Sequence, residues 1–355
     1  MSCLERAVFL TLLDNVLGTG GGSDSESAES IAGDSADVEF EVPASDRKKL
    51  EDVGVQVDAD DGMSTFVESI SSSDQKLFSC TGIHSVKLLD SITKCFDEIA
   101  PEKKEFKIST RDRILFTMMK IKLGLSFSVL AIFFNLNVQT CSNYFFDTVS
   151  VLAQVLKCMI FWPHKETILK NMPKCFKGFE HTRVILDGFE IPIQRSKCVR
   201  CRVRSYSDYK KKFTAKCLMI CTPSGFICLV CRACGGRASD KFITKHSGVL
   251  ELCDFGEGVM VDKGFAIDDE CDEFCLRLIR PPFLRKNKFS KSESVQCAKI
   301  ARARVHVERV IQRVREYAFL KNQVPWNLVP CLDDVLIIVS ALVNLGPPIL
   351  ANNKF

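Results

Sequence analysis

The chain lacks a hydrophobic run long enough to cross a bilayer, and it lacks a secretory signal. The apolar stretch from Val335 to Leu345 is shorter than the roughly 20 residues that a spanning helix needs. The apolar segment from Ala7 to Leu13 is flanked by Glu5 and Asp14, and no small-residue cleavage site follows it. A basic amphipathic helix of the kind that binds membrane surfaces is also lacking. These absences predict no membrane partner, and an intracellular setting in which most of the 18 cysteines are reduced thiols.

What the chain does have is charge, and it is unevenly distributed. Residues 1–75 carry 17 acidic and 4 basic residues, a net charge of −13, whereas the remainder carries 44 basic and 27 acidic residues, a net charge of +17. A body this basic favours a polyanionic partner, because neutralised phosphates release counterions. Residues 1–75 are rich in Ser, Gly, Asp and Glu, and they contain too little apolar surface to offset chain entropy. We therefore predict a disordered acidic leader before the basic body.

Residues 76–173 show a helical pattern. Ser109 precedes an amphipathic run from Arg111 to Leu123, as expected of a capped helix. Two shorter apolar runs follow at 125–134 and 138–146, and the short break between them is typical of a helix-turn-helix. The second helix of that motif enters the major groove of DNA, which makes its first polar residues candidate DNA contacts: Gln139, Thr140, Ser142 and Asn143. The alternative is a small helical bundle without DNA contacts, because such bundles have the same spacing.

Residues 174–350 alternate between strand and helix patterns. Strands are expected at 183–193 and 258–262, a hairpin at 212–234 around Pro223-Ser224-Gly225, and helices at 242–252 and 290–317. A strand, a hairpin, a helix, a strand and a late helix follow one another in the ribonuclease H-like fold. We therefore predict an α/β (α+β) chain, in which a ribonuclease H-like mixed sheet flanked by helices follows a small all-helical domain.

Three carboxylates in this region have the pattern of a two-metal phosphodiester site. Asp187 ends the apolar run 184–186, Asp262 ends the run 259–261, and Glu308 lies at the edge of an apolar helical stripe. Divalent metals prefer oxygen ligands on rigid elements, and strand ends with a helix packed across them supply such ligands. The alternatives are local: each aspartate precedes a turn-forming sequence, and Glu308 has the spacing for an ion pair with Arg304.

Other polar residues near these acids are weaker candidates for metal ligands. Asp240 is the rival second acid, although N-terminal helix capping explains it, and a strand end holds a ligand more rigidly. Glu190 is expected on the opposite strand face from Asp187, in a structural role. His306 is two positions from Glu308, and we expect it to contact phosphate or lie at the surface rather than bind metal.

Basic residues and cysteines form further clusters. Three basic clusters suit a DNA groove around the acids, and the residues predicted to contact DNA from two of them are Lys210, Lys211, Lys216, Arg304 and Arg309. The third cluster is Arg285, Lys286, Lys288 and Lys291. The pairs Cys198/Cys201 and Cys231/Cys234 have zinc-ligand spacing, but the second pair follows an apparent strand, and we expect zinc not to be bound.

Taken in order, the blocks around these residues resemble the DDE superfamily endonucleases of the transposase-4 type, relatives of Harbinger-like and IS4/IS5-like transposases. The resemblance extends from about Phe78 to Leu350 and includes Val184–Glu190, Tyr206–Lys210, Gly235–Lys241, Asp262–Phe265, Pro281–Leu284 and Arg304–Arg309. It implies DNA strand cleavage and transfer with Mg²⁺ or Mn²⁺, with Asp187, Asp262 and Glu308 as catalytic and metal-binding acids. It also implies a nuclear protein.

Two departures from the family pattern bear on function. Phe189 stands where the family commonly has Thr, and residues 1–75 lack the Cys/His pattern of the THAP-type zinc finger that begins many animal members. Recognition of transposon ends is therefore in doubt, which leaves open a separate DNA-recognition partner and a homo-oligomer. We predict a transposase-derived, divalent-metal-dependent DNA endonuclease or strand-transfer enzyme. The alternatives are a domesticated DNA-binding protein that no longer cleaves and, more weakly, a zinc-stabilised interaction module.

Overall fold

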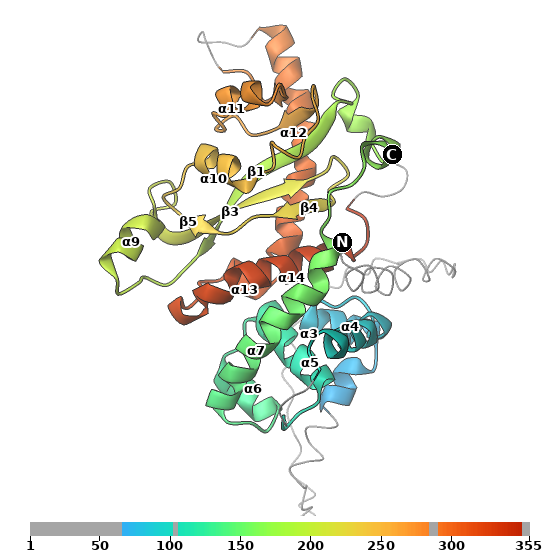
Figure 1. Cartoon of the computed structure of the whole chain (residues 1–355), viewed down its shortest axis with the longest axis vertical. Helices are drawn as coiled ribbons and strands as arrows, with labels where there is room; N and C mark the ends of the chain where they lie inside the picture. Colours follow the sequence, from blue (N-terminus) through green and yellow to red (C-terminus); the bar gives the residue numbers. More distant parts are fainter. Residues whose placement is uncertain (1–65, 102–105, 284–289, 350–355) are drawn as a thin grey trace, which may run out of the picture.

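The computed structural model describes residues 66–101, 106–283 and 290–349 (Figure 1). Of the acidic leader predicted to be disordered at 1–75, residues 1–65 lie outside the described residues, whereas residues 66–71 are helical and α3 begins at Asp74. Three of the four residues of the third basic cluster, Arg285, Lys286 and Lys288, also lie outside the described residues.

The helical region begins the described chain, and short polar side chains cap most of its helices. Its helices are α3 (Asp74–Thr81), α4 (Val86–Ile99), α5 (Thr110–Leu123), α6 (Phe127–Phe133), α7 (Val138–Leu156) and α8 (Lys165–Lys170), with 3₁₀ turns η1 (Lys157–Met159) and η2 (Lys174–Phe176). Ser109 accepts a hydrogen bond from the Asp112 backbone and starts α5 one residue before the expected run. Asn137 caps α7 in the same way, so the break between the two predicted helices is confirmed.

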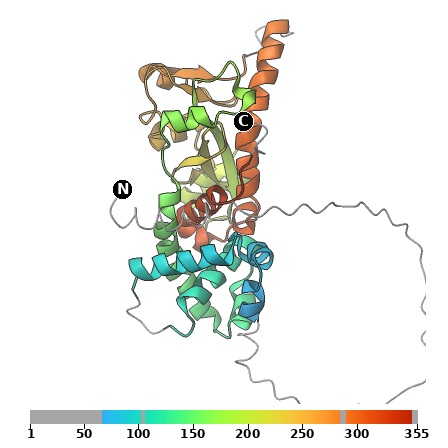
Figure 2. The ribbon, with the colours of Figure 1, turned by 90° about the vertical axis from the view of Figure 1, so that its right-hand side faces the viewer.

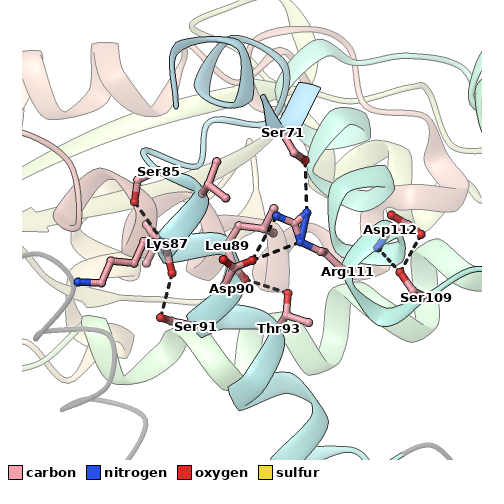
Figure 3. Close-up of polar contacts among 12 residues, drawn as sticks. Ser71, Ser85, Lys87, Leu89, Asp90, Ser91, Thr93, Ser109, Arg111 and Asp112 are labelled. Atoms are coloured by element: carbon pink, nitrogen blue, oxygen red, sulfur yellow. Dashed lines mark hydrogen bonds and ion pairs between the residues drawn. The ribbon is translucent and has the colours of Figure 1, made fainter. Parts of the chain in front are cut away.

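Polar contacts fix α5 against its neighbours at its N-terminal end (Figure 3). The Arg111 guanidinium lies 3.2 Å from the Asp90 carboxylate on α4 and donates to the Ser71 hydroxyl at 3.3 Å. Ser109 also donates to the Asp112 carboxylate at 2.7 Å. These contacts are partly exposed, so they orient α5 while the buried apolar faces supply most of the stability.

A mixed sheet follows, with the strand order β2-β3-β1-β6-β7. Its strands are β1 (Thr182–Pro192), β2 (Tyr206–Ser207), β3 (Lys212–Cys221), β4 (Ile227–Val230), β5 (Cys234–Gly235), β6 (Gly258–Met260) and β7 (Arg277–Ile279). The β3 strand is antiparallel to β1, β4 and β5, whereas β1, β6 and β7 are parallel. This is the ribonuclease H-like arrangement, and the predicted fold class is confirmed.

Helices cover both faces of this sheet. They are α9 (Val199–Ser205), α10 (Asp240–Ser247), α11 (Asp268–Glu273), α12 (Lys291–Val314), α13 (Ala318–Lys321), the 3₁₀ turn η3 (Trp326–Cys331) and α14 (Leu332–Asn344). The long α12 runs beside the sheet (Figure 2), and its buried residues share a core with one sheet face, with α14 and with the helical region. The other sheet face packs on α10 and α11 around a second, smaller core. The helical region therefore shares a core with one side of the sheet.

Helix α14 lies between the helical region and the sheet. Among the described residues, one segment, Trp326–Asn344, is long and apolar enough by length and composition to cross a membrane, and 61% of its most apolar window is buried. The prediction that no run is long enough to cross a bilayer is therefore wrong for this segment, which begins nine residues before the apolar run Val335–Leu345. Because α14 packs on α7, α12 and β4, its apolar composition is that of a core helix.

Candidate active site

The three predicted acids come from three neighbouring elements. Asp187 lies in the middle of β1, and Asp262 follows β6, which pairs with β1 only as far as Ile185. Asp187 is therefore not at a strand end as predicted, but it and Asp262 each lie two residues beyond the last β1–β6 pair, Ile185 and Met260, so the two aspartates face one region. Glu308 lies in α12, which packs across the sheet face that carries Asp187, and both residues line the same groove.

One guanidinium joins the two aspartates. Arg304, one turn before Glu308 on α12, places one terminal nitrogen 2.8 Å from Oδ1 of Asp262 and the other 3.5 Å from Oδ1 of Asp187. Both carboxylates therefore point at the same cationic group. Arg304 was predicted to contact DNA, but here its side chain is directed at the acids because they supply the nearest negative charge.

Burial and neighbouring charge alter the protonation of the first acid. Desolvation raises the pKa of Asp187 from its ordinary value of 3.8 to about 6, the attraction of Arg304 opposes this rise, and the negative charges of Asp262 and Glu308 add to it. The Asp187 side chain is 19% exposed and that of Asp262 is 51% exposed. Asp187 is therefore the acid whose charge costs most to maintain.

The rival acid Asp240 lies on the other side of the sheet. Its Oδ1 is 3.0 Å from the Lys216 ammonium, and a Cβ at position 188 would come within 2.7 Å of the same oxygen. Gly188 therefore leaves room for Asp240 behind β1.

Lys216 was predicted to bind DNA, but it pairs with Asp240 and donates to the Ala238 carbonyl. Glu190 accepts hydrogen bonds from two hydroxyl groups, those of Ser207 and Thr214.

A groove of about 790 Å³ opens beside Asp187 and Glu308. Its walls also carry four basic residues, Lys210, Lys212, Arg315 and Lys321, and apolar side chains from β1, α12 and α13. Lys211 lies at the exposed turn between Lys210 and Lys212, and Arg309 is partly exposed on α12. Arg315 was not among the predicted DNA contacts, although it stands seven residues after Glu308, two turns along the same helix face.

The prediction for His306 is wrong. Its side chain is buried, with Nδ1 at 2.7 Å from the Pro223 carbonyl and Nε2 at 3.4 Å from the Cys175 sulfur. The ring also packs edge-on against Phe176. A residue two positions from Glu308 points to the opposite side of α12, which here is the core.

The helix-turn-helix presents its predicted contact residues at the start of α7. Gln139 and Asn143 are exposed and are joined by a hydrogen bond of 3.0 Å, while Thr140 and Ser142 are partly buried. Apolar side chains are also exposed around them, with Ile132 79% and Val138 48% exposed. The surface of this unit is therefore polar and apolar, but not basic.

The three acids have the donor type that a divalent cation prefers, but not the spacing. Oxygen ligands from two aspartates and a glutamate suit Mg²⁺ or Mn²⁺, and the two aspartates already converge on one cationic group. Within the described ranges, no group of three or more His, Cys, Asp or Glu residues has the spacing to hold a metal ion, the two Cys pairs included. The oxygen donors of the three acids are thus of the type that Mg²⁺ or Mn²⁺ prefers. The spacing of the two aspartates, however, is the one that accommodates the Arg304 guanidinium.

The fold of the sheet region is ribonuclease H-like, and it brings two of the predicted acids onto one guanidinium and the third into the same groove. Residues 186–344 match the family profile of the DDE superfamily endonuclease, and residues 106–158 match the helix-turn-helix of DDE superfamily endonuclease. The two matches follow one another in the order helix-turn-helix and then endonuclease, which supports a transposase-like nuclease function with DNA as partner. No curated protein and no solved structure matches the chain significantly.

Proposed function

We propose that this protein cleaves DNA phosphodiester bonds, and transfers the resulting strands, with a divalent cation held by Asp187, Asp262 and Glu308. The observation that carries the proposal is the convergence of Asp187 and Asp262 on a single guanidinium. The Asp187 carboxylate is largely buried and that of Asp262 is half-exposed, and two carboxylates this close together repel each other, so a bound cation would stabilise the pair.

Each residue has a distinct role in this proposal. Asp187 is held rigidly by strand pairing on β1, Asp262 is more exposed and can adjust, and Glu308 closes the site from α12. When bound, Mg²⁺ or Mn²⁺ supplies Lewis-acid activation of the attacking oxygen and charge stabilisation of the leaving oxygen. Asp240 is assigned a structural role, because Lys216 neutralises it behind the sheet.

The DNA backbone is proposed to lie in the groove beside the acids. Lys210, Lys212, Arg315 and Lys321 line this groove together with Asp187 and Glu308. Basic side chains next to an acidic centre neutralise phosphates without entering the metal site. Lys211, exposed between Lys210 and Lys212, extends this basic surface, and the partly exposed Arg309 on α12 is proposed as a further phosphate contact.

At the start of α7, the polar residues predicted from the sequence are proposed to contact base edges or sugars. A separate DNA-recognition partner and a second copy of the chain remain compatible with this assignment. We further propose that the protein acts in the nucleus, and that the described chain divides functionally into a helical region to about residue 173 and a nuclease region to about residue 350. A fluorescent fusion that stays outside the nucleus would contradict the proposed location.

Nicking of supercoiled DNA in the presence of Mg²⁺ or Mn²⁺ tests the activity. Wild type is expected to nick, while Asp187→Asn and Asp262→Asn lose activity by about 10³-fold or more, because each removes a metal ligand. Asp240→Asn is the matched control and should retain most of its activity. If wild type binds DNA without nicking at any metal concentration, the domesticated DNA-binding alternative is correct.

A further inference from the structure

The acid cluster already contains a cation from the chain itself. Arg304 contacts Asp262 at 2.8 Å and Asp187 at 3.5 Å through different terminal nitrogens, so its planar head lies between the two carboxylates. A Lys side chain carries one point charge and is less suited to span two acids in this way. The guanidinium thus bridges the groups that are assigned to the metal.

The surroundings of Arg304 give it few other partners. The residue is only 9% exposed, and its Nε is buried without a hydrogen-bond partner. A buried guanidinium nitrogen without a partner costs stability, so the rest of the pocket is not built to hold this side chain. The two aspartates are what keep it in place.

We propose that Arg304 is a built-in counter-cation that competes with the divalent metal for Asp187 and Asp262. The inference rests on the proposed metal-dependent function of the same site. Without metal, the guanidinium screens the repulsion between the aspartates and stabilises the fold. For metal to bind both aspartates, the guanidinium must leave at least one of them, and this exchange weakens the apparent metal affinity. Arg304 is accordingly a positioning residue: it determines the metal concentration at which Asp187 and Asp262 exchange the guanidinium for the divalent cation.

The position of Arg304 on α12 supports this exchange. Arg304 and Glu308 are four residues apart, so they project from one face of the helix as neighbours. The same rigid turn therefore carries the competing cation and the third acid. When the guanidinium leaves, Glu308 remains beside Asp187 without any movement of the backbone.

Calorimetric titration of the full chain with Mn²⁺ alone, without DNA, tests the competition. Arg304→Gln removes the charge and keeps a side chain of similar length, and we expect its Kd for Mn²⁺ to fall by about tenfold or more. Mn²⁺ should also raise the Tm of this variant more than that of wild type. Arg302→Gln is the matched control, since it makes the same charge change at an exposed position on the same helix, and its Kd should stay close to that of wild type.

Further variants separate the outcomes. A folded Arg304→Gln protein with the wild-type Kd for Mn²⁺ overturns the competition, and if Asp187→Asn still abolishes Mn²⁺ binding, the proposed metal function stands. Absence of Mn²⁺ binding in wild type, Arg304→Gln and Arg304→Lys alike overturns the metal function and the competition with it. If Arg304→Gln does not fold without metal, recovery of its fold by Mn²⁺ supports the competition, and Arg304→Lys should then bind Mn²⁺ more tightly than wild type. If Mn²⁺ does not restore the fold of Arg304→Gln and Arg304→Lys does not bind Mn²⁺ more tightly than wild type, the competition is refuted.

Discussion

The two regions that are proposed to face DNA differ sharply in charge. Between Leu123 and Lys157, which covers α6 and α7, the sequence contains no Lys or Arg, and Asp147 is its one charged residue. The groove is instead highly charged: it is lined by four basic residues, Lys210, Lys212, Arg315 and Lys321, and by four acidic ones, Asp187, Glu190, Glu308 and Glu316. Phosphate contacts provide most of the affinity for DNA, whereas base contacts provide specificity. The comparison teaches that DNA affinity should come from the sheet region, and that the helix-turn-helix adds selectivity at most.

The largest expected effect concerns the core that the two regions share. Leu342 on α14 is fully buried, and its carbonyl accepts a hydrogen bond from His84 in the helical region. Leu342→Ala should cost about 2–5 kcal/mol of unfolding free energy through the cavity that it leaves. Circular dichroism and tryptophan fluorescence should report a single, coincident transition at lower temperature. Separate transitions would show that the helical region and the sheet region unfold independently and do not share one core. Leu169→Ala, at a half-exposed site, is the control and should lower the unfolding temperature much less.

Removal of the groove charges should have the next largest effect. The triple variant Lys210→Gln, Lys212→Gln, Arg315→Gln should weaken DNA binding by about 10–100-fold at moderate salt and should reduce the slope of log K against log salt by about 3. Fluorescence anisotropy across a salt series measures both quantities. Lys245→Gln is a single-site control on α10, where the lysine is exposed on the opposite side of the sheet. An unchanged salt slope in the triple variant would place the DNA elsewhere.

The raised pKa of Asp187 predicts that the first acid destabilises the metal-free fold. The folded-state pKa of about 6 lies above the ordinary value of 3.8, so the native state binds the proton more tightly between these values. Wild-type stability from this group therefore rises as the pH falls from about 6 towards 3.8. Asp187→Asn should be more stable than wild type by roughly 1–3 kcal/mol at pH 7.5 in a metal chelator. Urea unfolding at several pH values should show this difference shrinking to nothing below about pH 4.

The smallest effect is expected in the helix-turn-helix. The double variant Gln139→Ala, Asn143→Ala removes uncharged side chains, so it should weaken DNA binding by less than about tenfold and leave the salt slope unchanged. Anisotropy with two duplexes of different sequence separates lost selectivity from lost affinity. A loss as large as that of the groove triple variant would reverse the roles of the two regions.

Local sequence signals predicted the elements that carry the acids. Ser290 and Glu293 form the capping box that starts α12, and the predicted helix from 290 to 317 ends within three residues of the observed one. The apolar run before Asp187 similarly identified β1 to within one residue at each end. Such signals are contained in a few adjacent residues, so they can be read without knowledge of the fold.

Contacts between distant segments could not be read in this way. Strand β7 has three residues and no pattern of its own, and it exists because it pairs with β6. The bond from His306 to the Pro223 carbonyl and the bridge from Arg304 to both aspartates join residues that are far apart in the sequence. Periodicity places Arg304 and Glu308 on one helix face, but it does not say which neighbours that face meets.

Helix α12 also links the acid site to the helical region through a continuous stretch of backbone. Its 24 residues rise about 36 Å without a break. Three residues beyond its end, the buried Tyr317 hydroxyl donates to the Gly82 carbonyl of the helical region. The left-handed Gly82 leaves no room there for a side chain, since a Cβ would come within 2.4 Å of that hydroxyl. A substitution at Gly82 should therefore displace Tyr317, and with it the C-terminal end of the helix that also carries Arg304 and Glu308.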